Sequence, residues 1–544
     1  MSRPFLSLLL SVLLTSALGA LPLPEYLKAR YRGPTVRVHE IEGITDRVQD
    51  GKLPLRFQDF LTLVLKNSTD IHLTRLDVMT AADAVLAAKS PFDPAYTFGW
   101  RTQRANSPQY TQTSGAETLS ALNHSGEVGL NQALTTGQTI GINFAGSRYS
   151  DNSSFNYFNP SIASGLSISM VQPLLYNRNN LQARTALKIA RTQLVISTDQ
   201  TEMRIAAYID QAAQQYWDAV QARDSIRVAQ LAVDLAQKSY DRDKMALDLG
   251  ALSKLDIFQS QSQVAQRKVE LIRAQYFYRE SLDGLRRLIG ADLIPATRNI
   301  EIVLEDDPSS LPVSSIRPVE DAIKSALERR PELKVVRERF TIDDMNAKVA
   351  RNSMLPRFDL GLQAGGNGLG GNQIPISGPL GGPTQFIPGG LGDSLSQMLR
   401  FQSPYYGFSI QATIPVRSSQ AEASRADALV NRARDQYTRR QTEQQVIQEV
   451  KRAISELDMA NAQIEAARIA RDLAQKNVEA QQQRYEIGGI TPFELLDAQT
   501  RLASVEGSLV SAYANYQKSL VAYKRATWTL LDGLGVIVET PKVK

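Results

Sequence analysis

The feature that most limits how this chain can fold is a long stretch without proline or glycine, from Asn177 to Leu247. A single helix of its ~70 residues, rising 1.5 Å per residue, would extend about 105 Å, which is wider than a globular domain. Helices of this length are normally stabilised by coiled-coil packing. A second stretch of the same kind runs from about Ser418 to Glu486. The sequence therefore predicts an elongated protein built around two long helices.

Each long stretch ends at a glycine turn that is followed by a new helix start. The first turn begins Leu249-Gly-Ala-Leu-Ser, and the second begins Ile487-Gly-Gly-Ile-Thr, at an offset of 238 in the numbering (487 minus 249). Gly250 and Gly488 occupy the position after a helix end where glycine adopts left-handed backbone angles without strain. Capping boxes follow, formed by Ser253 with Asp256 and by Thr491 with Glu494. We therefore predict two helical hairpins, with these turns at their ends.

Two regions, 94–173 and 357–415, change from helical spacing to a period of two. Ile140, Ile142 and Phe144, for example, alternate with small or polar residues. Strict alternation predicts strands with one apolar and one polar face. Segments of about 9–11 residues suit tilted strands that cross a bilayer, and the polar face suits a water-filled lumen. The alternation alone is equally compatible with a soluble sandwich.

The chain reads as an internal duplication. Asp234-Leu-Ala-Gln-Lys238 recurs as Asp472-Leu-Ala-Gln-Lys476, at the same offset as the two turns. Before the strands the offset is 262 (319 minus 57), so the first copy carries about 24 extra residues, which we assign to an added hairpin at 125–148. The predicted segments are a signal peptide at 1–20, an extended leader at 21–54, a first repeat at 55–294 (helix, strands at 94–173, helical hairpin at 177–290), a linker at 295–318, a second repeat at 319–533 (helix, strands at 357–415, helical hairpin at 418–533) and a tail at 534–544.

The N-terminus and the composition limit the possible functions. Arg3 precedes an apolar run and a small-residue cleavage site, the pattern of a secretory signal peptide. The chain has no cysteine, three scattered histidines and no catalytic constellation, so we expect neither an enzyme nor a metal or cofactor site. A net charge of +5 comes from interspersed charges, which argues against nucleic-acid binding.

One segment, 361–392, is rich in glycine, which makes up 12 of its positions. It lacks the Gly-Lys-Ser/Thr signature of a phosphate loop, and no helix is expected directly after it. The composition predicts a flexible loop that joins two strands.

The predicted strands are too few for one chain to close a barrel. Open sheet edges are prohibitively costly in lipid. If these strands lie in a membrane, several chains must share one barrel, and the same symmetry would close the helices into a tube.

The duplicated order of strand, proline, long helix, glycine turn and return helix resembles the outer membrane efflux protein (TolC-type) family. The resemblance covers about residues 55–533, and it is carried by Gln172-Pro173-Leu-Leu, Leu249-Gly250, Ile414-Pro415 and the run from Tyr485 through Thr491 to Asp497. It implies an α+β membrane protein in the cell outer membrane. In that fold a homotrimer shares one β-barrel of twelve strands, four per protomer, on a long α-helical coiled-coil tunnel in the periplasm.

The resemblance also implies a function and partners. Members of the family are passive exit ducts of tripartite efflux or type I secretion systems, and they dock a periplasmic adaptor and an inner-membrane transporter. The alternative is a secreted or periplasmic coiled-coil adaptor or scaffold without a pore. Two departures stand out: the added hairpin either raises the strand number to six per protomer or folds outside the barrel, and Ile490 replaces an arginine latch that a family member can carry.

Candidate site residues follow from the turns and the strand ends. Asp497 lies one helical turn beyond Glu494 on the same side of the helix, so a ring of such acids would attract cations. The family places a paired acidic constriction at these two positions, and Asp256 is the equivalent of Glu494 in the first copy. The alternative for Asp497 is a favourable helix-dipole position without a role in a pore. The residues expected to dock the adaptor are Gly250, Leu252, Ser253, Gly488, Gly489, Ile490 and Thr491, and Pro173 and Pro415 mark the change from strand to helix.

Overall fold

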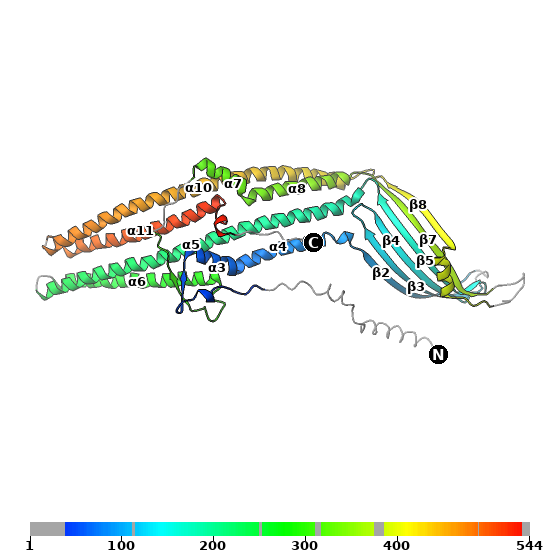
Figure 1. Ribbon diagram of the computed structural model, residues 1–544, viewed down its shortest axis with the longest axis horizontal. Coiled ribbons are helices and arrows are strands. Elements are labelled where there is room, and N and C mark those ends of the chain that lie inside the picture. The colour runs from blue at the N-terminus through cyan, green and yellow to red at the C-terminus, as the bar shows by residue number, and fades with distance from the viewer. Residues whose placement is uncertain are drawn as a thin grey trace.

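The computed structural model describes residues 38–110, 115–249, 253–309, 317–374, 386–487 and 489–535. The molecule is elongated, with helices along most of its length and one sheet at the far end (Figure 1). The α-helices are α3 (Phe57–Asn67), α4 (Thr69–Ala87), α5 (Leu181–Asp248), α6 (Lys254–Ile289), α7 (Val319–Arg329), α8 (Pro331–Asn352), α9 (Leu391–Leu399), α10 (Ser419–Glu486) and α11 (Pro492–Ala526). The strands are β1 (Lys52–Leu55), β2 (Ala95–Pro108), β3 (Thr118–Ala133), β4 (Thr139–Ser150), β5 (Phe158–Pro173), β6 (Glu301–Leu304), β7 (Arg357–Gln373) and β8 (Ser403–Thr413). Within the described ranges, no helix combines the length and the apolar character needed to cross a membrane. The predicted signal peptide at 1–20 lies outside the described residues, as do all but the first two residues of the predicted tail.

The two long helices, α5 and α10, each have 68 residues. The first starts at Leu181, four residues later than the expected Asn177, because Asn177, Asn179 and Asn180 have left-handed backbone angles. Asparagine tolerates that conformation better than most residues, so this cluster forms the corner between strand and helix.

Shorter helices complete a layer beside the long ones. In the half nearer the sheet the packing order is α4, α5, α8, α10, and in the half nearer the hairpin ends it is α6, α5, α11, α10. The two pre-strand segments, each predicted as one helix, are broken at Ser68 and Arg330, where the backbone is extended. Each half of the molecule is therefore one layer of four helices. In both layers α5 is an inner helix, with a neighbour on each side.

The largest buried cluster lies at the middle of the molecule, where α3, α5 and α6 meet β1 and β6. Tyr216 and Trp217 on α5 are almost fully buried there and contact the ring of Phe57. Burial of large aromatic side chains is a dominant stabilising contribution, so this cluster anchors the first repeat.

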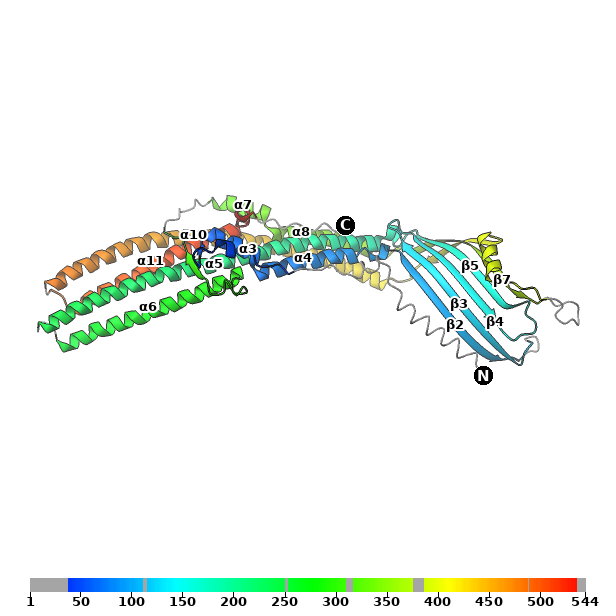
Figure 2. The same cartoon turned by 60° about the horizontal axis from the view of Figure 1, so that its bottom comes forward.

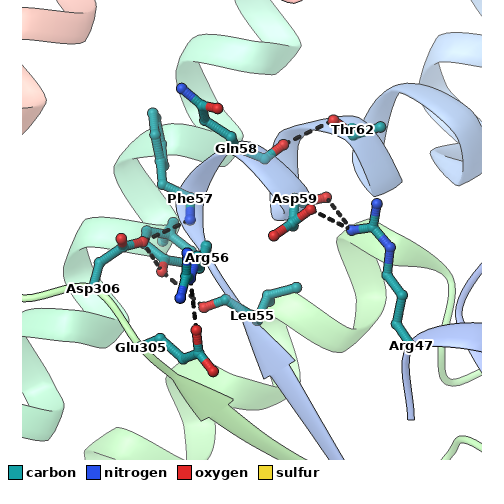
Figure 3. Close-up of polar contacts among 10 residues, drawn as sticks. Arg47, Leu55, Arg56, Phe57, Gln58, Asp59, Thr62, Glu305 and Asp306 are labelled. Atoms are coloured by element: carbon teal, nitrogen blue, oxygen red, sulfur yellow. Dashed lines mark hydrogen bonds and ion pairs between the residues drawn. The ribbon is translucent and has the colours of Figure 1, made fainter.

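The predicted leader and linker are more ordered than expected, because part of each joins a small parallel sheet. Lys52 to Leu55 of β1 pair with Glu301 to Leu304 of β6. Figure 3 shows the polar contacts at its edge: Asp306 accepts the Phe57 backbone N–H at 2.6 Å, and Arg56 pairs with Glu305 at 2.7 Å. The Tyr216 hydroxyl also donates to Asp306, and its pKa is raised by burial and by this acidic neighbour. These contacts therefore fix the start of the first repeat against the linker between the two repeats.

Among the residues that the structure describes, the large sheet has six strands in the order β2-β3-β4-β5-β7-β8, all antiparallel to their neighbours. The added hairpin of the first repeat lies within β3 and β4 and pairs on both sides, so it is part of the sheet. The four strands per chain that the family resemblance implied are wrong for this chain. The strands are also longer than predicted, at 11 to 17 residues. In Figure 2 the sheet continues beyond the ends of α4 and α5 as one layer.

The two faces of the sheet differ in polarity, as the alternation predicted. Phe98, Val128, Phe144 and Leu166 share one pairing row and one face. On the other face, polar side chains alternate with small residues, and the adjacent row there consists of Thr97, Gly129, Asn143 and Ser167.

The glycine-rich segment is not simply a flexible loop. Its first part, up to Gln373, belongs to β7, and Leu391 to Leu399 form α9, which packs on that strand. A Cβ atom at Gly368 would lie 1.8 Å from the carbonyl oxygen of Ser394, and one at Gly370 would lie 2.3 Å from that of Gly390. The glycines are therefore required by the close approach of a helix to a strand.

Candidate functional site at the helical hairpin ends

The two hairpin ends lie together at the end of the molecule opposite the sheet (Figure 1). The first lies between Asp248 at the end of α5 and Lys254 at the start of α6, and the second between Glu486 of α10 and Pro492 of α11. Several predicted site residues lie outside the described part of the chain: Gly250, Leu252, Gly488 and the side chain of Asp256.

The second hairpin end has the predicted N-cap, with one of the two hydrogen bonds of the predicted capping box. Thr491 is the N-cap of α11, and its side chain accepts a 3.4 Å hydrogen bond from the Glu494 backbone N–H, while Pro492 occupies the first turn. The Gly489 N–H donates to the carbonyl of Arg484 at 2.8 Å, which closes the turn after α10. Ser253 and Gly489 are exposed, and Ile490 is half-buried. The end therefore presents small residues together with the large apolar side chains of Ile487 and Phe493, which are 83% and 62% exposed.

Both candidate constriction acids of the second repeat are exposed. Glu494 and Asp497 on α11 are exposed, whereas the neighbouring Leu495 and Ala498 are buried. Asp497 forms an ion pair with Arg501 at 2.9 Å, one helical turn further along. The sequence analysis did not anticipate this pair. It partly neutralises one acid, so Glu494 carries more of the uncompensated negative charge than expected.

A buried polar link joins the two hairpins near their ends. Asp243 of α5 is only 2% exposed and accepts a 2.8 Å hydrogen bond from the Tyr485 hydroxyl of α10. It also accepts a hydrogen bond from the Ser260 hydroxyl of α6. The guanidinium of Arg242 lies 4.7 Å from the centre of the Tyr485 ring, in a cation–π contact. Three helices therefore meet at one carboxylate.

A second set of polar contacts joins α11 to the first hairpin. The Gln499 side-chain amide donates to the Ser239 hydroxyl at 3.2 Å, and Arg267 donates to Thr500 at 2.7 Å. Sequence reasoning did not assign these roles. A usable signal was present, because Gln499 lies at helical spacing between the apolar residues Leu495 and Leu502, where a buried polar group requires a partner.

The two strand-end prolines lie where strand changes to helix. Pro173 is the last residue of β5, and Pro415 follows the last residue of β8 by two positions. Each is followed by one of the two long helices. Proline cannot donate a backbone hydrogen bond, so it suits the end of a strand.

The side chains at the hairpin ends are suited to holding helices together and to contacting a partner. Among the described residues, no group of three or more histidines and carboxylates is placed to hold a metal ion. The acids are exposed or paired, and the buried polar groups join helices to one another. The arrangement fixes the relative position of two hairpins and presents exposed acids beside their ends.

Comparison with known proteins shows that the chain matches the model of a known protein family. The family model for "Outer membrane efflux protein" matches residues 60–291 and 322–527, which is most of the chain in two copies. A search by sequence against curated proteins finds no match.

Solved structures share the fold at low sequence identity. A membrane protein from Pseudomonas aeruginosa is 16% identical with a TM-score of 0.63, and the match covers 87% of this chain and 93% of that one. The CmeC outer membrane channel of Campylobacter jejuni is 15% identical with a TM-score of 0.59, over 87% and 86% of the two chains. The MtrE outer membrane channel of Neisseria gonorrhoeae, in its open state, is 14% identical with a TM-score of 0.57, over 91% and 98%.

The duplicated helical hairpins, the two-faced sheet and the repeated family match agree with one another. The chain belongs to the TolC-type outer membrane efflux protein family, and it is an outer-membrane channel protein rather than an enzyme.

Proposed function

We propose that three copies of this chain close into a passive exit duct through the outer membrane, working with a periplasmic adaptor and an inner-membrane transporter in efflux or type I secretion. The proposal rests on one observation: the sheet and the two helix layers leave their edges uncovered on the same two sides of the molecule. The sheet ends in β2 on one side and β8 on the other. The helix layers end in α4 or α6 on the side of β2, and in α10 on the side of β8. One rotation between neighbouring copies would cover all of these edges at once.

The edge helices carry the apolar side chains that such a contact requires. On α4, Leu73, Met79 and Leu86 are each more than half exposed. On α10, Leu429 and Val430 are similarly exposed. Exposed apolar rows on both outer helices of a layer favour a neighbouring copy as the partner.

The sheet gives an independent reason for closure. An open strand edge in lipid leaves backbone N–H and C=O groups without partners, at a cost of several kcal/mol each. Pairing β8 of one copy with β2 of the next removes both edges. The alternative of an adaptor or scaffold without a pore leaves the six-stranded sheet and its apolar face without a role.

Crosslinking tests the proposed neighbour contact. Leu76 lies about three helical turns before the end of α4 at Ala87, and Val430 lies about three turns after the start of α10 at Ser419. With equal rises of 1.5 Å per residue, both are about 16 Å from the strand ends. The chain has no cysteine, so the double variant Leu76→Cys/Val430→Cys should form a disulfide-linked trimer ladder. Leu76→Cys/Leu473→Cys is the control, because Leu473 lies near the other end of α10. A monomeric mass in detergent and no ladder would overturn the proposal.

The hairpin ends are the proposed docking surface for the adaptor. Gly489, Ile490 and Thr491, with Gly250, Leu252, Ser253 and Gly488, combine small residues with apolar ones, which suits packing against a partner helix pair. Gly488→Glu should abolish export while the yield of trimer is unchanged. Export that persists in this variant would show that docking occurs elsewhere, and the glycines would then only end the helices.

The proposed constriction is made by exposed acids near the same ends. Glu494 and Asp497 from each copy, with Asp256 from the first hairpin, would place carboxylates around the axis of the closed tunnel. Such a ring concentrates cations and repels anions. The exposure of Glu494 and Asp497 supports this proposal. Because Arg501 pairs with Asp497, we expect a weaker preference for cations than two unpaired acids per copy would produce.

A further inference from the structure

The helix layer and the sheet of one chain have nearly equal widths. Six strands spaced about 4.8 Å apart and tilted by about 40° cover roughly 38 Å of barrel circumference. Four helices spaced about 9 Å apart cover roughly 36 Å of tunnel circumference. A sheet of four strands would cover only about 25 Å by the same estimate. The hairpin β3–β4 therefore supplies the width that would otherwise be missing above the helices.

We propose that the closed assembly forms an eighteen-stranded barrel about as wide as its helical tunnel, so that the duct does not narrow where it crosses the membrane. This inference rests on the proposed trimer, in which three chains contribute six strands each. The backbone diameter of such a barrel is about 36 Å, compared with about 24 Å for twelve strands. Side chains extend about 5 Å inward from each wall. The free width then rises from about 14 Å to about 26 Å.

The added hairpin is paired as a full part of the wall. β3 pairs with β2 from Thr118 to Asn131, and β4 pairs with β5 from Thr139 to Tyr149. A flap folded over the lumen or the rim would leave at least one of these ladders incomplete. The ladders are continuous, so the hairpin widens the sheet rather than covering it.

The polarity of β3 and β4 also fits a wall between lipid and water. Val128 and Phe144 share a row on the apolar face, and the residues beside them in sequence, Glu127 and Ala145, share a row on the other face. A hairpin outside the barrel would not need the same alternation, in phase with its neighbours.

The consequence concerns the class of cargo. A free width of about 26 Å passes a pair of packed helices, about 20 Å across, whereas a gap of about 14 Å passes only a single helix of about 10–12 Å. Selection by size then falls to the proposed constriction at the hairpin ends rather than to the membrane-spanning part.

Deletion of the hairpin is the direct test. Removing Thr118–Ser150 leaves β2 and β5 running in opposite directions, joined at the same end of the sheet. Tyr96 and Ile168 already share a row through Leu130 and Ile142, so the two faces stay in phase. Electron cryomicroscopy in lipid nanodiscs should give a barrel diameter of about 36 Å for the full chain and of about 24 Å for the deletion variant. A barrel of about 24 Å in the full chain, with β3 and β4 outside the ring, would overturn the inference.

Cysteine labelling of the full-length protein keeps the inference testable if the deletion variant does not fold. In nanodiscs, a water-soluble maleimide should label Ser125→Cys and Ala145→Cys at least fivefold faster than Val128→Cys and Phe144→Cys. Gln363→Cys and Leu362→Cys on β7 are the matched control pair, because that strand is in the wall under either arrangement. Equal labelling of all four hairpin positions would contradict an eighteen-stranded wall. A monomeric or dimeric mass of the same sample would instead contradict the proposed trimer, so the two failures are distinguishable.

Discussion

The hydroxyl of Tyr485 donates a 2.8 Å hydrogen bond to Asp243, so a side chain at the end of one helical hairpin holds a buried carboxylate of the other. Asp243 has a second donor in Ser260, and the Tyr485 ring is covered by Arg242. The relationship fixes the position of α10 against α5 close to the hairpin ends. Its loss should loosen the hairpins there before any other part of the molecule.

Removing the donor tests this role. Tyr485→Phe leaves one oxygen of a buried carboxylate without its partner, which costs about 1–3 kcal/mol. Single-channel conductance should increase because the two hairpins separate more easily at their ends. Tyr437→Phe is the control, since Tyr437 lies on the same helix and is 70% exposed. Equal conductance of the wild type and both variants would mean that the bond does not limit opening.

The ion pair at the proposed constriction gives opposite predictions for its two members. Asp497→Ala removes a negative charge and should lower the preference for cations, while Arg501→Ala frees the carboxylate and should raise it. Reversal potentials in planar bilayers under a salt gradient measure both. Stability should change by less than about 1 kcal/mol, because the pair is exposed. Shifts of the same sign in the two variants would remove Asp497 from the conduction path.

The packing of α9 on β7 predicts a sensitive glycine. Gly368→Ala adds a Cβ atom that would lie 1.8 Å from the carbonyl oxygen of Ser394. The carbonyl oxygen belongs to the backbone of α9 and cannot rotate away, so the helix must move. The buried hydrogen bond between Ser394 and Ser164 must then break. We expect a loss of about 1–3 kcal/mol and faster proteolysis between residues 386 and 402. Gly392→Ala on α9 is the control, because nothing lies within 4 Å of its added Cβ atom, and its cleavage rate should stay at the wild-type value.

A pair of acids between α8 and α10 predicts a pH dependence. Partial burial and the neighbouring Asp435 raise the pKa of Asp343. The folded protein therefore holds this proton more tightly than the unfolded chain, and the resulting stabilisation is present at low pH and is lost as the pH rises through the folded pKa. Asp343→Asn should raise the midpoint temperature of thermal unfolding at pH 7, by an amount equivalent to about 0.5 kcal/mol. The substitution should have no effect on this midpoint below about pH 4. A variant with equal effects at both pH values would exclude repulsion between these acids as the cause.

The sequence predicted the parts of the fold that depend on repeating local patterns. The long helices and the two-faced strands follow from periodicity, and the α11 start follows from Thr491 and Pro492. The length of the glycine-rich strand was missed because Gly366 and Gly368 are required by a tertiary contact with α9, which leaves no periodic trace in the sequence. The pairing of Leu53 with Ile302 joins two strands from distant parts of the chain, beyond the reach of any local signal.

The candidate site was predictable only in outline. Glycine and proline marked the hairpin ends, since their backbone preferences act locally. The link between Asp243 and Tyr485 depends on how two separate hairpins lie against each other, which no single stretch of sequence specifies. Arg501 could have been paired with Asp497 from helical spacing alone, because residues four apart are neighbours on a helix.

The unequal share of strands between the two repeats lowers the symmetry of the assembly. Each chain contributes two similar helical hairpins, so the proposed ring of three chains would approximate sixfold symmetry along its tunnel. In the sheet the first repeat supplies β2 to β5 and the second supplies only β7 and β8. Around the proposed barrel, broad arcs from the first repeat would alternate with narrow arcs from the second, and only the threefold axis would remain. A cargo molecule leaving such a tunnel would pass from six near-equivalent walls to three pairs of unlike ones.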